Sequence, residues 1–167
     1  EILGYQSDSQ QVTAGFDYRF GTRLFVGSAF SFSQSDTESN VDAGEQDSAV
    51  SILNVYGSYY FTDSLYLDLV TSVGASDYDM KRNYRFGDAV VAANSDTSGD
   101  QWGFSAAMGF ERAFGAWLLD SFARVETRQL SIDDYTETGG AGLGLAVDEQ
   151  EVESNQAVLG GAMGWVY

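Results

Sequence analysis

Apolar and polar residues alternate along most of this sequence, and this period of two residues restricts the chain to β-structure. In residues 11–20 the even positions are apolar or aromatic, from Val12 to Phe20, whereas the odd positions are polar, small or charged. Such alternation places the two kinds of side chain on opposite faces of a strand. No apolar run approaches the about 18 residues that a membrane-spanning helix needs. The sequence therefore predicts an all-β fold.

The same alternation predicts seven strands, each of about 10–13 residues. They cover residues 11–20, 24–33, 49–61, 65–76, 101–112, 117–129 and 156–167. Strands of globular proteins usually have about 5–6 residues, whereas a tilted strand that crosses a bilayer needs about 9–11. Strand length thus favours a transmembrane β-barrel. The strand 49–61 is apolar on both faces, so its outward side stays open at this stage.

The predicted connections alternate between short and long. Residues 21–23, 62–64 and 115–116 are tight turns, and residues 34–48, 77–100 and 130–155 are long polar loops that hold 17 of the 25 acidic residues. Short turns at one end and long loops at the other are typical of an outer-membrane barrel. Aromatic residues near the strand ends fit interfacial girdles; they are Phe20, Phe61, Phe110, Trp117, Trp165 and Tyr167.

The charges indicate which face of the strands is outward. The aromatic face carries no charge, whereas the opposite face carries eight predicted lumen-facing residues: Asp17, Arg19, Asp68, Glu111, Asp120, Arg124, Glu126 and Arg128. A soluble eight-stranded barrel would bury these charges in its core, at a prohibitive cost unless they were paired. A water-filled lumen accepts them. We therefore expect an antiparallel up-and-down barrel of seven to eight strands, with Val12, Phe16, Leu67, Leu69, Phe104, Met108 and Val125 outward.

Composition excludes several classes of function. The formal charge is −17, which argues against a nucleic-acid partner, because phosphate binding needs a basic patch. The chain has no Cys and no His, so thiol chemistry, disulfides and His-containing zinc sites are excluded. It also has no Pro. A closed barrel has no edge strand, and edges are where sheets tolerate proline.

Several phrases in order make the sequence resemble the β-domain of autotransporters, the type V secretion translocators. They are VTAGFDYRF at residues 12–20, LFVGSAFSFSQSD at 24–36, NVYGSYYFTDSLYLD at 54–68, DYDMKRN at 77–83 and YTETGGAGLGLAVDEQEVES at 135–154. The resemblance implies a Gram-negative outer-membrane location, a twelve-stranded porin-like barrel and a lumen segment that leads to an N-terminal passenger. It also implies outer-membrane lipid, lipopolysaccharide and the barrel-assembly machinery as partners.

The chain departs from the family pattern in strand number. Four strands after residue 167 and one before residue 1 are missing, although residues 2–6 could supply a short eighth strand and close the barrel alone. Residues 1–167 are therefore expected to be one barrel domain or part of a larger barrel. The alternative function is a small structural or adhesive outer-membrane barrel with acidic outer loops.

We expect no catalytic, cofactor or metal site. The lumen carboxylates could support self-cleavage of a passenger, but pairing with Arg19, Arg124 and Arg128 across the lumen is the simpler expectation. Acidic residues 133–134 and 148–153 could attract Ca²⁺, yet they lack the pattern of a calcium loop. The glycines of 139–144 lack the Lys-Ser/Thr of a phosphate loop. The basic cluster Lys81–Arg85 is expected to neutralise Asp77 and Asp79, with contact to lipopolysaccharide phosphates as the alternative.

Overall fold

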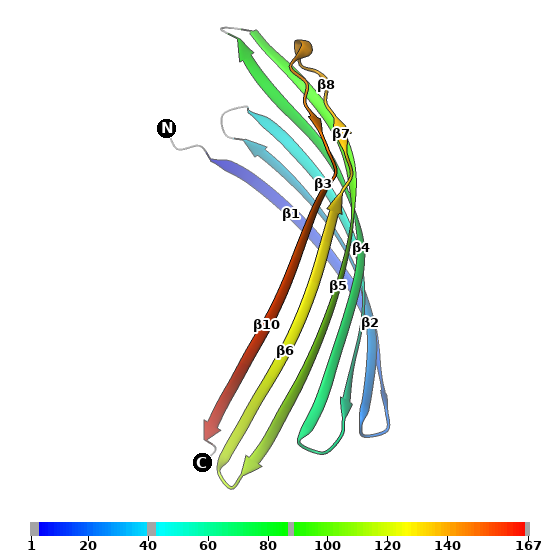
Figure 1. The fold of residues 1–167 in the computed structure, drawn as a ribbon, viewed down its shortest axis with the longest axis vertical. Helices are drawn as coiled ribbons and strands as arrows, with labels where there is room; N and C mark the ends of the chain where they lie inside the picture. Colours follow the sequence, from blue (N-terminus) through cyan, green and yellow to red (C-terminus); the bar gives the residue numbers. More distant parts are fainter. Residues whose placement is uncertain (1–3, 40–42, 87–88, 166–167) are drawn as a thin grey trace.

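The computed structural model describes residues 4–39, 43–86 and 89–165 of the chain. Seven long strands form one antiparallel meander in the order β1-β2-β3-β4-β5-β6-β10 (Figure 1). Their bounds are Tyr5–Phe20 (β1), Leu24–Ser39 (β2), Gly44–Tyr60 (β3), Leu65–Phe86 (β4), Ala89–Phe114 (β5), Trp117–Ile132 (β6) and Gln150–Trp165 (β10). The predicted strand order is confirmed, and no described helix is long and apolar enough to cross a membrane.

The strands are longer than predicted, with 16 to 26 residues each. The tight turns are where we expected them, at 21–23, 61–64 and 115–116. The expected long loops at 34–48 and 77–100 are wrong, because residues 34–39, 44–48, 77–86 and 89–100 belong to paired strands. Residues 40–42 and 87–88 lie outside the described part of the chain. In β4 and β5 the register runs without a break from Leu65↔Phe110 to Phe86↔Ala89. Tyr5 and Gln6 extend β1 and pair with β2, so these two residues belong to no separate eighth strand. Residues 2 and 3 lie outside the described residues.

The third long connection, between β6 and β10, does contain irregular structure. It holds the short strands β7 (Tyr135–Thr136), β8 (Thr138–Gly139) and β9 (Ala146–Val147) and the 3-10 turn η1 (Gly140–Gly142). β7 pairs with β9, and β8 pairs with β5. The connection therefore folds against the upper part of the β4–β5 hairpin, as Figure 1 shows.

Apolar side chains cover one face of the sheet without being packed in a core. Within the described residues Ala93 is the one buried apolar residue. Six of the seven predicted outward residues are exposed, and Leu67 is half-buried: Val12, Phe16, Leu69, Phe104, Met108 and Val125 are the exposed ones. On β3 the register places Leu53, Val55 and Tyr59 on this apolar face, which resolves the open assignment of that strand.

Aromatic pairs gather near the turn end of the sheet, where the three tight turns lie. Tyr18 packs edge-on against Phe20 at 4.7 Å between ring centroids, and Tyr59 against Phe61 at 5.1 Å. Trp117 and Trp165 lie opposite each other on β6 and β10, with centroids 4.5 Å apart. Amphipathic rings at such a level fit a membrane–water interface. Tyr167 falls outside the described residues.

Candidate functional site

The eight predicted lumen residues share the polar face of the sheet, opposite the apolar face. Residues that lie directly opposite one another on successive strands form a row across the sheet, which we call a pairing row. These rows are straight, because the register has no bulge. One row contains Asp17 on β1 and Glu126 on β6, and the next contains Arg19, Asp68 and Arg124. Glu111 and Asp120 lie directly opposite each other nearer the turns.

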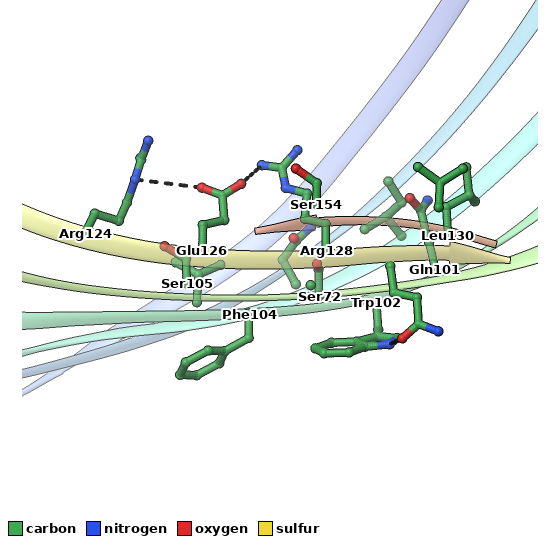
Figure 2. A pocket seen from close by; sticks show the side chains of 16 residues that line it. Ser72, Gln101, Trp102, Phe104, Ser105, Arg124, Glu126, Arg128, Leu130 and Ser154 are labelled. Atoms are coloured by element: carbon green, nitrogen blue, oxygen red, sulfur yellow. Dashed lines mark hydrogen bonds and ion pairs between the residues drawn. The ribbon is translucent and has the colours of Figure 1, made fainter. Parts of the chain in front are cut away.

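Glu126 is the centre of the charged group on this face. Its carboxylate lies 2.6 Å from Nη2 of Arg128 and 3.7 Å from Nε of Arg124. The Glu126 side chain is only 13% exposed, whereas that of Arg128 is 73% exposed. Figure 2 places these three side chains on one side of the ribbon and Trp102 and Phe104 on the other. Two guanidinium groups share one carboxylate, so the group carries a net positive charge.

A groove of about 500 Å³ lies beside this group. Polar side chains from several strands line it, among them Asn54, Ser72, Gln101 and Ser154. Serine, asparagine and glutamine both donate and accept hydrogen bonds. The groove can therefore hydrogen-bond a polypeptide or water, while its arginines attract anionic groups.

The expected pairing of the other carboxylates is wrong. In the described part of the chain, ion pairs reach Arg124 and Arg128 only from Glu126, on their own strand. Arg19 donates a hydrogen bond to the carbonyl oxygen of Thr22 instead, at 3.1 Å. One carboxylate oxygen of Asp120 is buried without a hydrogen-bond partner. Nearer the turns than the row of Arg19, Asp68 and Arg124, the polar face carries the two carboxylates of Glu111 and Asp120.

Glycines on the polar face leave room for aromatic rings of the neighbouring strand. Gly27 lies opposite Tyr56, Gly109 opposite Tyr66, and Gly160 opposite Phe122. A Cβ atom at any of these glycines would overlap the facing ring. The rings therefore lie flat over the glycine positions instead of extending away from the sheet.

At the loop end of the sheet a second polar group surrounds Glu137. Arg82 of β4 donates to its carboxylate at 2.6 Å, and the expected pairing of the basic cluster 81–85 with Asp77 and Asp79 is wrong. Lys81 pairs with Glu45 instead, at 3.3 Å. The Arg82 guanidinium, with help from the backbone N–H of Leu145 and the hydroxyl of Tyr84, lowers the pKa of Glu137. We did not predict this group, because 55 residues separate the two partners.

Five aspartates form a row across the apolar face near the same end. Asp8, Asp36, Asp47, Asp79 and Asp96 are directly opposite one another on β1 to β5, and all are exposed. Five adjacent carboxylates do not fit a hydrocarbon environment. This row therefore lies beyond the part of the strands that meets lipid tails. Among the described residues no group of three or more such side chains is arranged to hold a metal ion.

Comparison with known proteins identifies the family. The sequence model of one protein family, described as the autotransporter beta-domain, matches residues 1–167. The chain belongs to the autotransporter β-domain family. It is accordingly a β-domain of the outer membrane, with an up-and-down barrel fold and the architecture of a translocator.

Curated relatives of this autotransporter domain include esterases named EstA. Those of Pseudomonas aeruginosa and Pseudomonas putida are each 28% identical over 156 residues, which is 89% of this chain and 24% of theirs. An uncharacterised protein, YaiT of Salmonella typhimurium, is 25% identical over 169 residues and is matched over 16% of its length. The chain thus spans about a quarter or less of these relatives.

Solved structures show the same fold. The translocator domain of the autotransporter NalP from Neisseria meningitidis superposes with a TM-score of 0.78 at 16% identity, over 95% of this chain and 55% of that one. The ferric preacinetobactin receptor BauA from Acinetobacter baumannii reaches 0.61 at 11% identity, over 97% of this chain and 32% of that one. Both comparisons support the meander fold and nothing more specific.

Proposed function

We propose that this domain transports an N-terminal passenger across the outer membrane and then anchors it at the cell surface. The family match over residues 1–167 carries the proposal. The apolar face supports it: in the pairing rows of Phe16, Tyr18 and Phe20 this face carries no charge, and its charged residues lie nearer the turns (Arg112) or nearer the loop end (Glu153). A charge at mid-bilayer costs roughly 2–4 kcal/mol for Arg or Lys.

We also propose that residues 1–167 are one part of a larger barrel domain. β1 and β10 are the two edges of the described sheet, and neither pairs with the other. Unpaired backbone groups cost several kcal/mol each in hydrocarbon, so an open edge is not stable there. Strands outside residues 1–167 would pair with both edges, in keeping with a chain that covers 55% of the NalP translocator domain.

In this proposal the polar face lines the lumen. The groove beside Arg124, Glu126 and Arg128 would contact the segment that connects the domain to its passenger. The domain itself would not be an enzyme: its work is to bind and guide a polypeptide. The esterase activity that the relatives' names state belongs to those whole proteins, and this chain matches only 24% of their length.

The apolar face would contact outer-membrane lipid, and the region beyond the aspartate row would contact lipopolysaccharide. Lys81 and exposed Arg85 share the face of Asp79 on β4, further from the membrane, where they would contact sugar phosphates. The barrel-assembly machinery would hold the open edges until the remaining strands pair. The acidic row itself would repel phosphates, which limits such contacts to the end of the hairpin.

The test is surface display by the full-length protein in a Gram-negative host. An epitope near the N-terminus of the mature chain should be accessible to antibody on intact cells, and deletion of residues 1–167 should abolish this signal. A chain in which a signal peptide directly precedes Glu1 would support the alternative, a small structural or adhesive barrel. Full display after the deletion would refute a role in transport.

A further inference from the structure

The connection between β6 and β10, residues 133–149, is docked on the β4–β5 hairpin through several independent contacts. β8 pairs with β5 through Ala93↔Gly139 and Asn94↔Thr138. The Thr138 hydroxyl donates to the carbonyl oxygen of Asn94 at 3.2 Å. The Tyr84 hydroxyl of β4 donates to the carbonyl oxygen of Leu143 at 2.9 Å. Both strands of the hairpin therefore hold this connection, which we call the docked loop.

Glu137 joins the two sides of the contact. Its carboxylate accepts hydrogen bonds from Arg82 at 2.6 Å and from the backbone N–H of Leu145 at 2.9 Å, and Tyr84 lies within 3.4 Å. The side chain is only 9% exposed. The guanidinium of Arg82 also lies over the Tyr84 ring, 4.7 Å from its centroid. A mostly buried carboxylate with charged and neutral donors forms strong hydrogen bonds.

The backbone of the docked loop is shaped for this contact. Residues 139–142 all have positive φ, between 51° and 89°, including Ala141, which is not a glycine. This conformation places Gly140 against Ala93, which is 1% exposed, and against the Tyr84 ring. Positive φ at a non-glycine residue persists where surrounding contacts hold it. Contacts with Ala93 and Tyr84 thus hold the turn at residues 139–142 in this conformation.

The contact lies on the polar face, at the loop end. The register of β4 and β5 has no break, so Arg82 and Tyr84 share the face of Ser72, and Ala93 shares the face of Gln101. This is the face that lines the lumen in the proposed function. The docked loop therefore lies at the lumen's outer mouth.

We propose that the docked loop is a fixed part of the wall of this mouth, and that an exported passenger passes beside it without displacing it. This inference rests on the proposed transport function. It predicts that tethering the docked loop leaves export intact. Releasing the loop should expose residues 133–149 to protease and leave the folded barrel unchanged.

The first test tethers the docked loop to β5 in the full-length protein. Asn94 and Thr138 are directly opposite, and Cβ atoms of such pairs lie about 4.5–5.5 Å apart, close to the span of a disulfide. Residues 1–167 contain no cysteine, so within this domain the cysteines of N94C/T138C can pair only with each other. We expect passenger display within twofold of each single-cysteine variant, with or without reductant. A tenfold loss that reductant restores would overturn the proposal. Absence of display from the wild type as well would refute the transport function instead.

The second test releases the docked loop with Glu137→Ala. Protease added to intact cells should then cut within residues 133–149 at least tenfold faster, while folding of the barrel, measured by heat-modifiable mobility on gels, stays unchanged. Glu45→Ala is the matched control, because it removes an exposed ion pair to the same strand, at Lys81. Equal cleavage of the two variants would contradict a docked loop held by Glu137.

Discussion

The ring of Tyr66 on β4 lies over Gly109, the residue directly opposite on β5. A Cβ atom at Gly109 would overlap the Cζ and hydroxyl oxygen of that ring. Glycine in a strand often marks such a close approach. Tyr66 therefore covers the backbone of β5 only because residue 109 has no side chain.

Gly109→Ala should destabilise the folded domain, because the Tyr66 ring has to rotate away from β5. Overpacking of this kind costs about 1–3 kcal/mol, and a ring that is free to turn places the effect near the lower value. Gly164→Ala is the control, since its Cβ would contact only Leu118, at 3.8 Å. The measurement is the temperature at which each variant loses heat-modifiable mobility on gels. Equal temperatures for both variants would show that the ring position is unimportant.

Replacing the central residue of the aspartate row, Asp47→Asn, should stabilise the loop end of the sheet. Asp47 has Asp36 opposite it on one side and Asp79 on the other. Like charges that are directly opposite destabilise a sheet by amounts on the order of 0.2–1 kcal/mol. Because salt screens exposed charges, the gain should be largest at low ionic strength. Denaturant unfolding at two salt concentrations measures it.

The control for this variant is Asp63→Asn, in the exposed 61–64 turn at the other end of the sheet. It removes the same charge without relieving a cross-strand pair. If Asp47→Asn gains no more than Asp63→Asn at low salt, repulsion within the row is negligible.

The apolar face could be predicted from the sequence, but the length of the strands could not. Alternation determines which side chains of one strand share a face. Because the register is unbroken, the apolar faces of the strands line up from Val12 on β1 to Val125 on β6. The polar ends of the hairpins look like loops in the sequence. They stay paired because backbone hydrogen bonds do not depend on side-chain polarity, and because hydroxyls such as those of Ser9 and Ser35, 2.8 Å apart, join across strands.

The partners of charged residues were the least predictable part of the site. Glu126 pairs with residues two positions away, on its own strand, although we expected pairs across the lumen. Cross-lumen pairing requires strands to face each other at short range, and strand order alone does not determine that distance. Arg82 and Glu137 meet only because the docked loop turns back onto β4.

Glu126→Gln should destabilise the domain more than Arg124→Gln. Removal of the carboxylate leaves two guanidinium groups without their partner, whereas Arg128 retains Glu126 at 2.6 Å when Arg124 is changed. Arg128 is mostly exposed, so water screens the loss. We expect the free energy of unfolding to fall by more than the about 1 kcal/mol of an exposed ion pair. The fall should stay below about 3 kcal/mol, the lower end of the range for buried pairs. Urea unfolding in detergent micelles compares the variants, and a larger cost for Arg124→Gln would contradict the shared-carboxylate arrangement.

Protease added to intact cells should cut within residues 133–149 and not at residues 62–64. The two segments lie at opposite ends of the sheet (Figure 1), and the turns of outer-membrane barrels are periplasmic. Residues 34–39 and 77–86 belong to paired strands and should resist cleavage. Permeabilised cells are the control, in which the 61–64 turn becomes accessible. Cleavage at 62–64 in intact cells would reverse the orientation of the domain.

Docking of the 133–149 loop should weaken in acid because Glu137 titrates. Its pKa is lowered in the folded protein, chiefly by the Arg82 guanidinium, so the docked state favours the charged carboxylate. The resulting stability is fully present above the ordinary glutamate pKa of about 4.3 and is lost as the pH falls through the lower folded value. A fluorophore attached to T138C should become more mobile as the pH falls through this lowered value and regain its order on return to neutral pH. The Glu137→Gln variant has no group that titrates at this position, so its fluorophore should be mobile to the same extent at both pH values. If the wild-type protein and the Glu137→Gln variant respond equally to acid, another group controls the docking.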